Sequence, residues 1–245
     1  MIKFFRKIRQ NLLMENKTGK YFKYAIGEIV LVVIGILIAL SINNWNENRK
    51  NKTLVDTYKK SLIENLAKDS LNVHNKLIKI NEDLEKIENF EYRVSASNEP
   101  FDTILDIARY EFDFKIQVLL DYENETYQIL NSTGNLALFS PEVTSELNSL
   151  YNLQETALQS QNKTTGIYLE NLSNYSRKYP FSLRNNLIQN GTIAADKIWN
   201  NISLNHHATE FNSLIILKSD NYRLSLALLP KIQVRINQLL KILRE

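Results

Sequence analysis

The pattern of hydrophobic and polar positions divides this chain into one long apolar run and a remainder with helical periodicity. Residues 24–42, YAIGEIVLVVIGILIALSI, form the apolar run, and its centre, residues 29–40, has no polar side chain. A helix of this length extends about 28 Å, close to the ~30 Å hydrocarbon core of a bilayer. The run therefore predicts one membrane-spanning helix.

After the apolar run, hydrophobic residues recur at alternating spacings of four and three from about Thr53 to Tyr92. This pattern predicts a helix with one buried seam. We expect the helix to continue from the membrane segment, or nearly so, and to end after Arg93. The seam residues are Val73, Leu77, Ile80, Leu84 and Ile87, with Leu62 and Leu66 before an interruption at Asp69.

Four further helical regions follow. They cover Phe101 to about Leu120, Glu123 to Asn131, Pro141 to about Lys178, and about His207 to Leu243. Ser140 suits the N-cap of the third region, because Pro141 takes the first helical position. Pro230 lies inside the last region and predicts a kink or a break. The seam of that last region is Ile215, Tyr222, Leu229, Ile236 and Leu243, with Phe211, Ile232 and Leu239 beside it.

The expected fold class is all-α: one N-terminal transmembrane helix followed by an extramembrane helical bundle with long coiled-coil-like helices. The predicted parts are a basic cytoplasmic or membrane-surface segment (1–23), the transmembrane helix (24–42) and an extramembrane all-α domain (43–245). The amphipathic seams are expected to pack within the chain. Self-association as coiled coils stays open.

Charge is distributed unevenly along the sequence. Residues 1–23 carry seven Lys or Arg and one acid, a net charge of +6, so the rest of the chain carries −3 of the total of +3. Lys3, Arg6, Lys7 and Arg9 are expected to face lipid headgroups. The basic flank favours a cytoplasmic N-terminus, and no nucleic-acid partner is expected. A cleaved signal peptide, with Ala39-Leu40-Ser41 as its cleavage site, is the alternative.

Several residues of the apolar run and its exit suit specific roles in a membrane. Gly27, Gly35 and Ala39 permit close packing against another membrane helix. Glu28 is an intramembrane acid, which is costly in lipid and could snorkel to the headgroups or serve an ion-dependent function. Trp45 lies where an aromatic interface anchor belongs.

The segments MIKFFRKIRQNLLMENK and KYAIGEIVLVVIGILIALSINNWNE resemble the N-terminus of a large family of Bacteroidota membrane proteins of unknown function. The stretch YQILNSTGNLAL at Tyr127–Leu138 is similar in style to a later segment of that family. The resemblance implies placement in the bacterial inner (cytoplasmic) membrane and supplies no activity to transfer. It also implies that five residues belong to the family's recurring pattern: Gly27, Glu28, Asn43, Asn44 and Trp45.

The sequence contains no recognisable reaction chemistry. It has no cysteine, which excludes disulfides, thiolate nucleophiles and Cys-type zinc sites. His206 and Glu210 have a metal-compatible spacing but are too few for a site, so they are expected on the surface. His207 points away from their face, and His74 is expected to be exposed. No catalytic motif occurs, and we expect no enzyme activity, no catalytic or metal-binding residue and no cofactor. A solvated helix face is expected from Glu82, Asp83, Glu85 and Glu88 with Lys76, Lys79 and Lys86.

Three functional hypotheses fit this pattern. The first is a membrane-anchored helical protein-interaction module, acting as scaffold, assembly or sensor subunit. Its partners would be membrane lipids and another protein or a second copy. The second is a subunit of an ion-coupled membrane complex that uses Glu28. The third is a solute-sensing helical bundle that signals through a partner.

Overall fold

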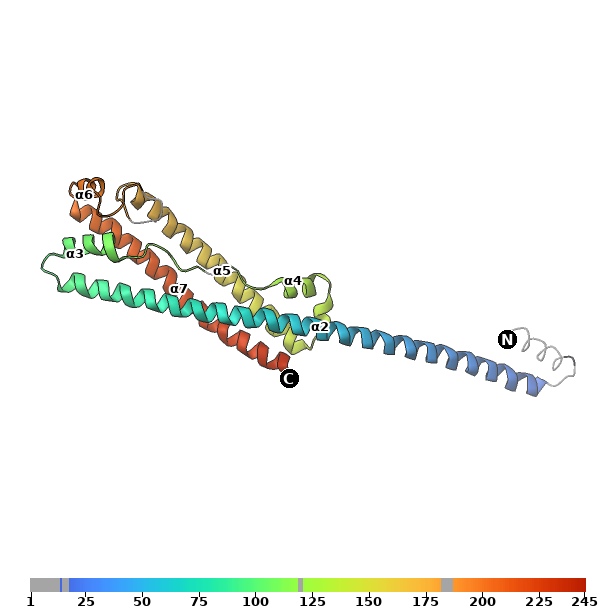
Figure 1. The fold of residues 1–245 in the computed structure, drawn as a ribbon. Helices are drawn as coiled ribbons and strands as arrows, with labels where there is room; N and C mark the ends of the chain where they lie inside the picture. Colours follow the sequence, from blue (N-terminus) through green and yellow to red (C-terminus); the bar gives the residue numbers. More distant parts are fainter. Residues whose placement is uncertain (1–13, 15–17, 119–120, 182–186) are drawn as a thin grey trace. The chain divides into compact units, whose positions relative to one another are not determined.

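The structure, a computed structural model, describes residue 14 and residues 18–118, 121–181 and 187–245. Within these ranges all regular secondary structure is helical, so the expected all-α class is confirmed (Figure 1). The elements are α2 (Thr18–Ala96), α3 (Pro100–Asp106), the π-helical turn η1 (Ile107–Glu111), α4 (Glu125–Ser132), the 3-10 turn η2 (Asn135–Leu138), α5 (Pro141–Ser176), α6 (Ile193–Trp199) and α7 (Leu204–Arg244).

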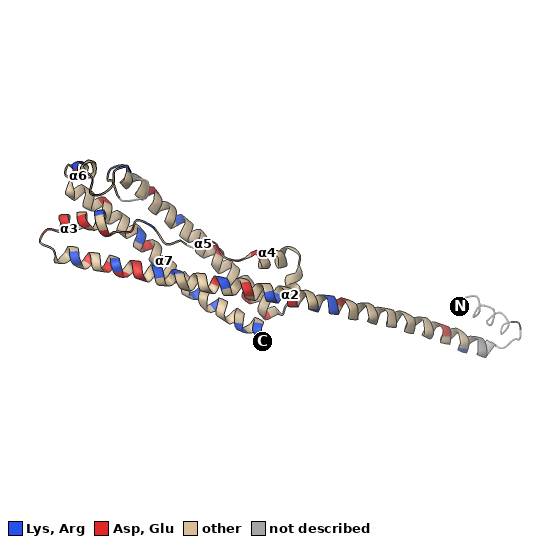
Figure 2. Ribbon diagram, in the orientation of Figure 1, with Lys and Arg blue, Asp and Glu red and all other residues tan. Residues whose placement is uncertain are grey.

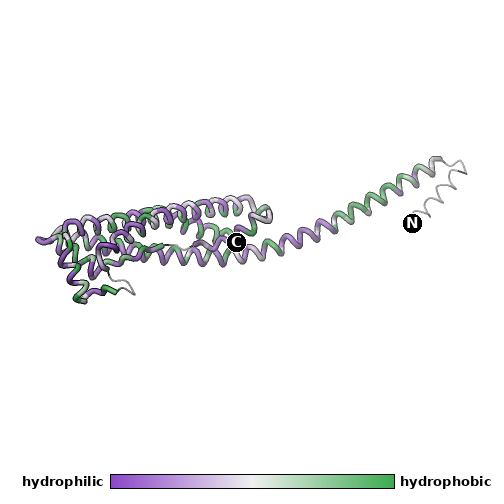
Figure 3. Tube along the Cα trace, turned by 90° about the horizontal axis from the view of Figure 1, so that it is seen from above, coloured by the Kyte–Doolittle hydropathy of each residue, from purple (hydrophilic) through white to green (hydrophobic). Residues whose placement is uncertain are grey.

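The chain divides into two compact units, residues 1–57 and residues 58–245. Helix α2 contributes to both, which confirms the expected continuity of the helix beyond the apolar run. An 18-residue window of this helix has a mean hydropathy of 2.8 and no buried residue (Figure 3). This part of α2 is therefore apolar enough and long enough to cross a membrane. A signal sequence near the N-terminus has the same properties. The boundaries expected at residues 23 and 42 lie inside α2 and stay predictions.

The larger core of the second unit lies between α2, α5 and α7. The seam of α2 faces it, with Val73 and Ile80 fully buried and Leu77 and Leu84 half-buried. The seam of α7 faces the same core from Tyr222 to Leu243 and the second core at Ile215, so both predicted seams pack inside the chain. The remaining buried members are Leu62, Leu66, Tyr122, Leu130, Leu136, Val143, Leu147, Leu150, Ala157, Tyr222, Leu229, Ile232, Ile236, Leu239, Leu240 and Leu243.

A second core is rich in aromatic rings and joins η1, the segment after it, α5, α6 and α7. Phe112 packs edge-on against Phe114 and Phe211, with ring centroids 4.9 and 5.1 Å apart. Edge-to-face pairs at this distance contribute beyond their buried area. The other buried members are Ile107, Ala108, Tyr168, Tyr175, Tyr179, Phe181, Ala195, Trp199 and Leu214.

The expected helix ends on either side of η2 are present. The Ser140 hydroxyl accepts a hydrogen bond from the Val143 amide at 3.3 Å and caps α5. Gly134 follows α4 with a φ of +73°, a conformation that glycine adopts without strain. Pro230 does not end α7, which continues as a helix from Leu204 to Arg244.

The helix expected from Phe101 to about Leu120 is wrong beyond Glu111. Phe112 has extended backbone angles, and residues 112–118 are not helical. Their backbone groups bond to side chains instead: the carbonyl of Phe114 accepts from the Tyr168 hydroxyl at 2.8 Å. Phe112 and Phe114 are both buried while Asp113 between them is exposed. This alternation is typical of an extended segment and was present in the sequence.

Replacing Ile80 by alanine tests the packing of α2 in the core. Ile80 is fully buried, so its truncation should lower the free energy of unfolding by about 2–5 kcal/mol. Ile78 on the same helix is 44% exposed, and Ile78→Ala should change the free energy of unfolding by less than about 0.5 kcal/mol. Denaturant unfolding of the full chain, followed by circular dichroism, measures both. Equal losses in the two variants would contradict this placement of the core.

Candidate functional site

A cavity of about 340 Å³ lies between the C-terminal part of α2, the α3–η1 segment and α7. Its volume falls in the range of small-molecule sites, which begins at ~300 Å³. The lining positions on α2 and α7 recur every three or four residues, so each helix presents one face to it. The apolar wall consists of Ile87, Phe90, Val94, Ile104, Ile107, Ala208, Phe211, Ile215 and Ile216.

Polar groups from α2 and α7 also line this cavity. Glu91 and Asn212 line the cavity and are exposed, while Asp220 and Arg223 pair at 3.6 Å. Ser219 also lines it and is only 8% exposed. Its hydroxyl makes no hydrogen bond within the described part of the chain. The cavity thus combines an apolar body with a few polar groups, the usual composition of a small-ligand site.

A buried polar network lies next to the cavity and joins α2 to α7. The Lys218 ammonium is 3.3 Å from a carboxylate oxygen of Asp83, and the Tyr222 hydroxyl donates to that oxygen at 2.7 Å. Lys218 also donates to the Asp113 carbonyl at 2.6 Å, and the Gln117 amide donates to the Tyr222 hydroxyl at 3.1 Å. These bonds occupy the charged groups, so the network holds the helices together.

Burial shifts the pKa values of Lys218 and Tyr222, and their bonds to Asp83 oppose that shift at Lys218 and add to it at Tyr222. Burial lowers the pKa of Lys218, and the neighbouring Asp83 carboxylate offsets part of that effect. Burial and the bond to Asp83 raise the pKa of Tyr222. A tyrosine with a raised pKa stays protonated and donates its hydroxyl hydrogen at neutral pH.

The expectation that Asp83 lies on a solvated helix face is therefore wrong. Asp83 is 8% exposed, and Lys76 on the same helix is 7% exposed. Burial, followed by the charge of Lys79, lowers the pKa of Lys76 to about 8. Glu82, Glu85 and Glu88 are exposed as expected. Figure 2 shows both signs of charge interspersed along α7 and along α2 beyond the apolar run.

A second buried carboxylate lies in the larger core. Asp69, 2% exposed, accepts hydrogen bonds from the Glu123 amide at 2.9 Å and from the Gln154 side chain at 3.2 Å. Burial raises its pKa to about 6 against the lowering effect of these two bonds. The interruption that Asp69 makes in the seam is thus a polar contact inside the core, which joins α2 to α5.

The histidines differ in their environment. His74 and His206 are exposed as expected, whereas His207, which was expected to point away from His206, is fully buried. Its Nε2 atom lies 2.8 Å from the Tyr175 hydroxyl, and burial lowers its pKa to about 4. Glu210 pairs with Lys178 at 2.5 Å instead of forming a metal site with His206. The described ranges contain no group of three or more possible metal ligands.

The residues singled out around the apolar run lie along α2. Gly27, Gly35 and Ala39 are exposed, and a Cβ added at either glycine would meet nothing within 4 Å. That side of the helix is open to a neighbour, and packing there stays a prediction.

Glu28 is half-buried, and its ion-dependent role stays a hypothesis. Trp45 is 64% exposed, with the Arg49 guanidinium 5.3 Å from its ring centroid. The lipid-facing residues Lys3, Arg6, Lys7 and Arg9 lie outside the described residues.

Asp69→Asn tests the buried carboxylate through pH. The folded-state pKa of Asp69 is about 6, against an ordinary value of 3.8. The folded protein therefore holds a proton there that the unfolded chain releases, and stability is lost as pH rises through this window. The Asp69→Asn variant has no carboxyl group at this position, so its stability does not fall through this pH window. Its advantage in unfolding free energy should grow from near zero at about pH 4 to about 1–3 kcal/mol at neutral pH. Denaturant titrations of both proteins across this range measure the difference, and one independent of pH would contradict the assignment.

Comparison with known proteins gives a family and no function. No curated protein and no solved structure matches the chain. A family model described as a family of unknown function, DUF6090, matches residues 28–222. The match begins inside the apolar run and extends through Tyr222, so it includes the buried network and nearly all of the cavity lining. This chain belongs to the DUF6090 family.

Proposed function

We propose that this chain is a single-pass protein of the bacterial inner membrane whose helical domain is a binding module. In this proposal the N-terminus is cytoplasmic and residues 43–245 are periplasmic. The module acts as a scaffold, assembly or sensor subunit, with lipids around its anchor and a protein partner or a second copy at its helices. The observation that carries the proposal is α2, which contains both the exposed apolar run and a buried seam of the core.

The energetics of the apolar run support an anchor. Residues 29–40 contain ten Ile, Leu and Val residues, and all are exposed within the chain. Burying one such side chain gains about 1.5–3 kcal/mol, so leaving all ten in water would cost more than the ~5–15 kcal/mol that stabilises a typical domain. A helix that is apolar all round needs an apolar environment, and a bilayer matches the length of this run.

The charges flanking the run support the orientation. Seven Lys or Arg precede it, while Arg49, Lys50 and Lys52 follow it. Lysine and arginine are more abundant on the cytoplasmic side of membrane helices. The excess before the run therefore favours a cytoplasmic N-terminus. The basic residues also complement the anionic cytoplasmic leaflet.

The polar groups of the domain support binding in place of catalysis. The buried charges of Asp83 and Lys218 are occupied with each other. The groups facing the cavity are one carboxylate without a partner in the described ranges (Glu91), one ion pair, two serine hydroxyls and an amide. This set can orient a ligand and contains no nucleophile paired with a base. We therefore expect no enzyme activity, and the interspersed charges of the domain give no reason to expect a nucleic-acid partner.

A second candidate is a solute-sensing bundle that signals through a partner. The cavity of about 340 Å³ favours it. One wall of the cavity belongs to α2, the helix that also contains the proposed membrane span. Binding there would act directly on the helix that leads to the membrane.

Single-cysteine labelling tests the topology. The chain has no cysteine, so Asn98→Cys and Lys7→Cys each introduce one thiol. Asn98 is exposed and makes no side-chain hydrogen bond in the described structure. A membrane-impermeant thiol reagent, given access to the periplasm of intact cells, should label Asn98→Cys and should leave Lys7→Cys unlabelled. Permeabilised cells provide the control, in which both thiols should react.

The reverse labelling pattern would overturn the orientation and direct the search to cytoplasmic partners. Labelling of both positions in intact cells would exclude a single span between them. An unlabelled Asn98→Cys that reacts after permeabilisation would place the helical domain inside the cell.

A further inference from the structure

The cavity between α2 and α7 has a charge that selects among ligands. Its lining contains two carboxylates, Glu91 and Asp220, and one guanidinium, Arg223. Arg223 lies 3.6 Å from Asp220, so this pair is close to neutral. Glu91 makes no hydrogen bond or ion pair within the described ranges. The cavity therefore has one uncompensated negative charge at its edge, next to an apolar wall.

Ser219 is a second observation that points to a ligand. Its side chain is more than nine-tenths buried and lines the cavity. The Ser219 hydroxyl makes no hydrogen bond to another described residue, and its oxygen stays accessible at the cavity wall. Serine offers both a donor and an acceptor. A polar atom of a bound molecule would complete its hydrogen bonding.

The size of the cavity limits the ligand. An apolar cavity of ~150 Å³ accommodates benzene, and this one, at about 340 Å³, is roughly twice as large. A molecule of about a dozen non-hydrogen atoms fits this volume. The wall of isoleucine, valine and phenylalanine side chains suits an alkyl or aryl body. It gives no partner to a strongly polar molecule such as a sugar.

We infer that this cavity binds a small amphiphile with an apolar body and one protonated amine. The body lies against Ile87, Ile107 and Phe211, and the amine pairs with Glu91 at the edge of the cavity. A carboxylate of the same shape is disfavoured, because Arg223 is already paired and Glu91 repels it. This inference rests on the second candidate function, the solute-sensing bundle, and names the class of its solute.

Two probes with the same apolar body and opposite charge test the inference: 4-phenylbutylamine and 4-phenylbutanoic acid. Isothermal titration calorimetry on the full chain in lipid nanodiscs, with empty nanodiscs subtracted, gives both affinities. The wild-type protein should bind the amine more tightly than the acid. Equal affinities, tighter binding of the acid, or no heat beyond that of empty nanodiscs would each overturn the inference.

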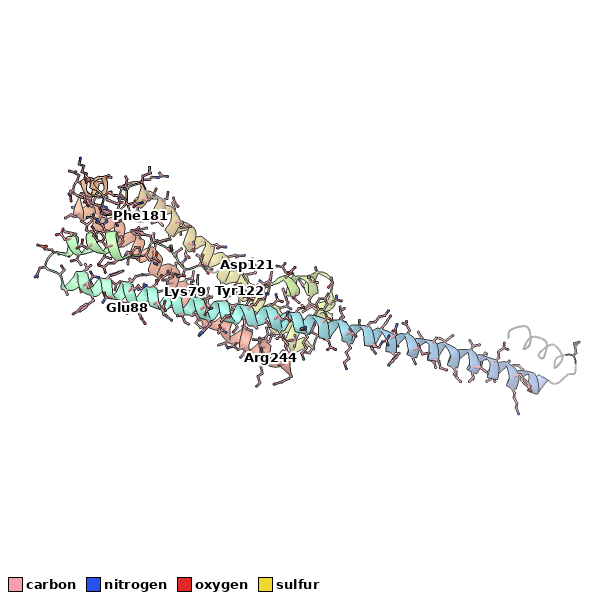
Figure 4. The ribbon with its side chains drawn as sticks, in the orientation of Figure 1. Lys79, Glu88, Asp121, Tyr122, Phe181 and Arg244 are labelled. Carbon is pink, nitrogen blue, oxygen red and sulfur yellow. The ribbon has the colours of Figure 1, made fainter. Side chains whose placement is uncertain are left out.

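Glu91→Lys and a matched control localise the binding. The change reverses the net charge of the lining, so the amine should bind at least about fivefold more weakly and the acid should become the preferred probe. Glu88 lies on α2 three residues earlier (Figure 4), is exposed and does not line the cavity. Glu88→Lys makes the same charge change and should leave both affinities unaltered. Equal losses in the two variants would show nonspecific attraction to the surface and would reject the site.

The calorimetry and the topology labelling fail independently. Calorimetry in nanodiscs does not depend on which side of a cell membrane the domain occupies. Absent amine binding with the expected labelling would reject this ligand class and leave the membrane-anchored module intact. Selective amine binding with the reverse labelling would reject the orientation and keep the site.

Discussion

The buried pair of Asp83 and Lys218 is the interaction on which the helical domain depends most. A charge left unpaired in a protein interior costs several kcal/mol, and Lys218 is only 2% exposed. The pair is satisfied only where α2 presents Asp83 to α7 and where residues 112–118 are extended. In that conformation the Asp113 carbonyl lies 2.6 Å from the Lys218 ammonium. Sliding α7 by one turn along α2 would separate these groups, so the pair selects one register.

The register fixed by this pair also positions the cavity. Ile87 follows Asp83 by one helical turn on α2, and Ser219 directly follows Lys218 on α7. The aromatic core lies behind the cavity, and Phe211 belongs to both. Structural groups and proposed ligand-binding groups therefore lie within about two turns of each other on the same two helices. A rigid network beside a site limits the reorganisation needed when a ligand binds.

The long helices α2, α5 and α7 were predictable from sequence because their apolar spacing is sustained and Ser140 marks a start. The burial of Asp83 and His207 was not predictable, because their hydrogen-bond partners, Tyr222 and Tyr175, lie far away in sequence. A charged residue on a helix looks the same in sequence whether it is solvated or paired inside. The extended segment was missed for a different reason: the alternation of Phe112 and Phe114 is short, and a helix was expected on both sides. The cavity is a gap in the packing between α2, the α3–η1 segment and α7. Its position depends on side chains from all three segments, so no local sequence pattern predicts it.

Alkaline extraction of membranes that contain the full chain tests the central claim most directly. The account predicts that residues 24–42 remain in the protein as a membrane span. After extraction with alkaline carbonate, the membrane pellet should retain the chain at its full mass of 28.6 kDa, as measured by intact mass spectrometry. Release into the supernatant would contradict a membrane span. A retained or soluble protein that lacks residues 1–41 would instead identify the apolar run as a cleaved signal peptide.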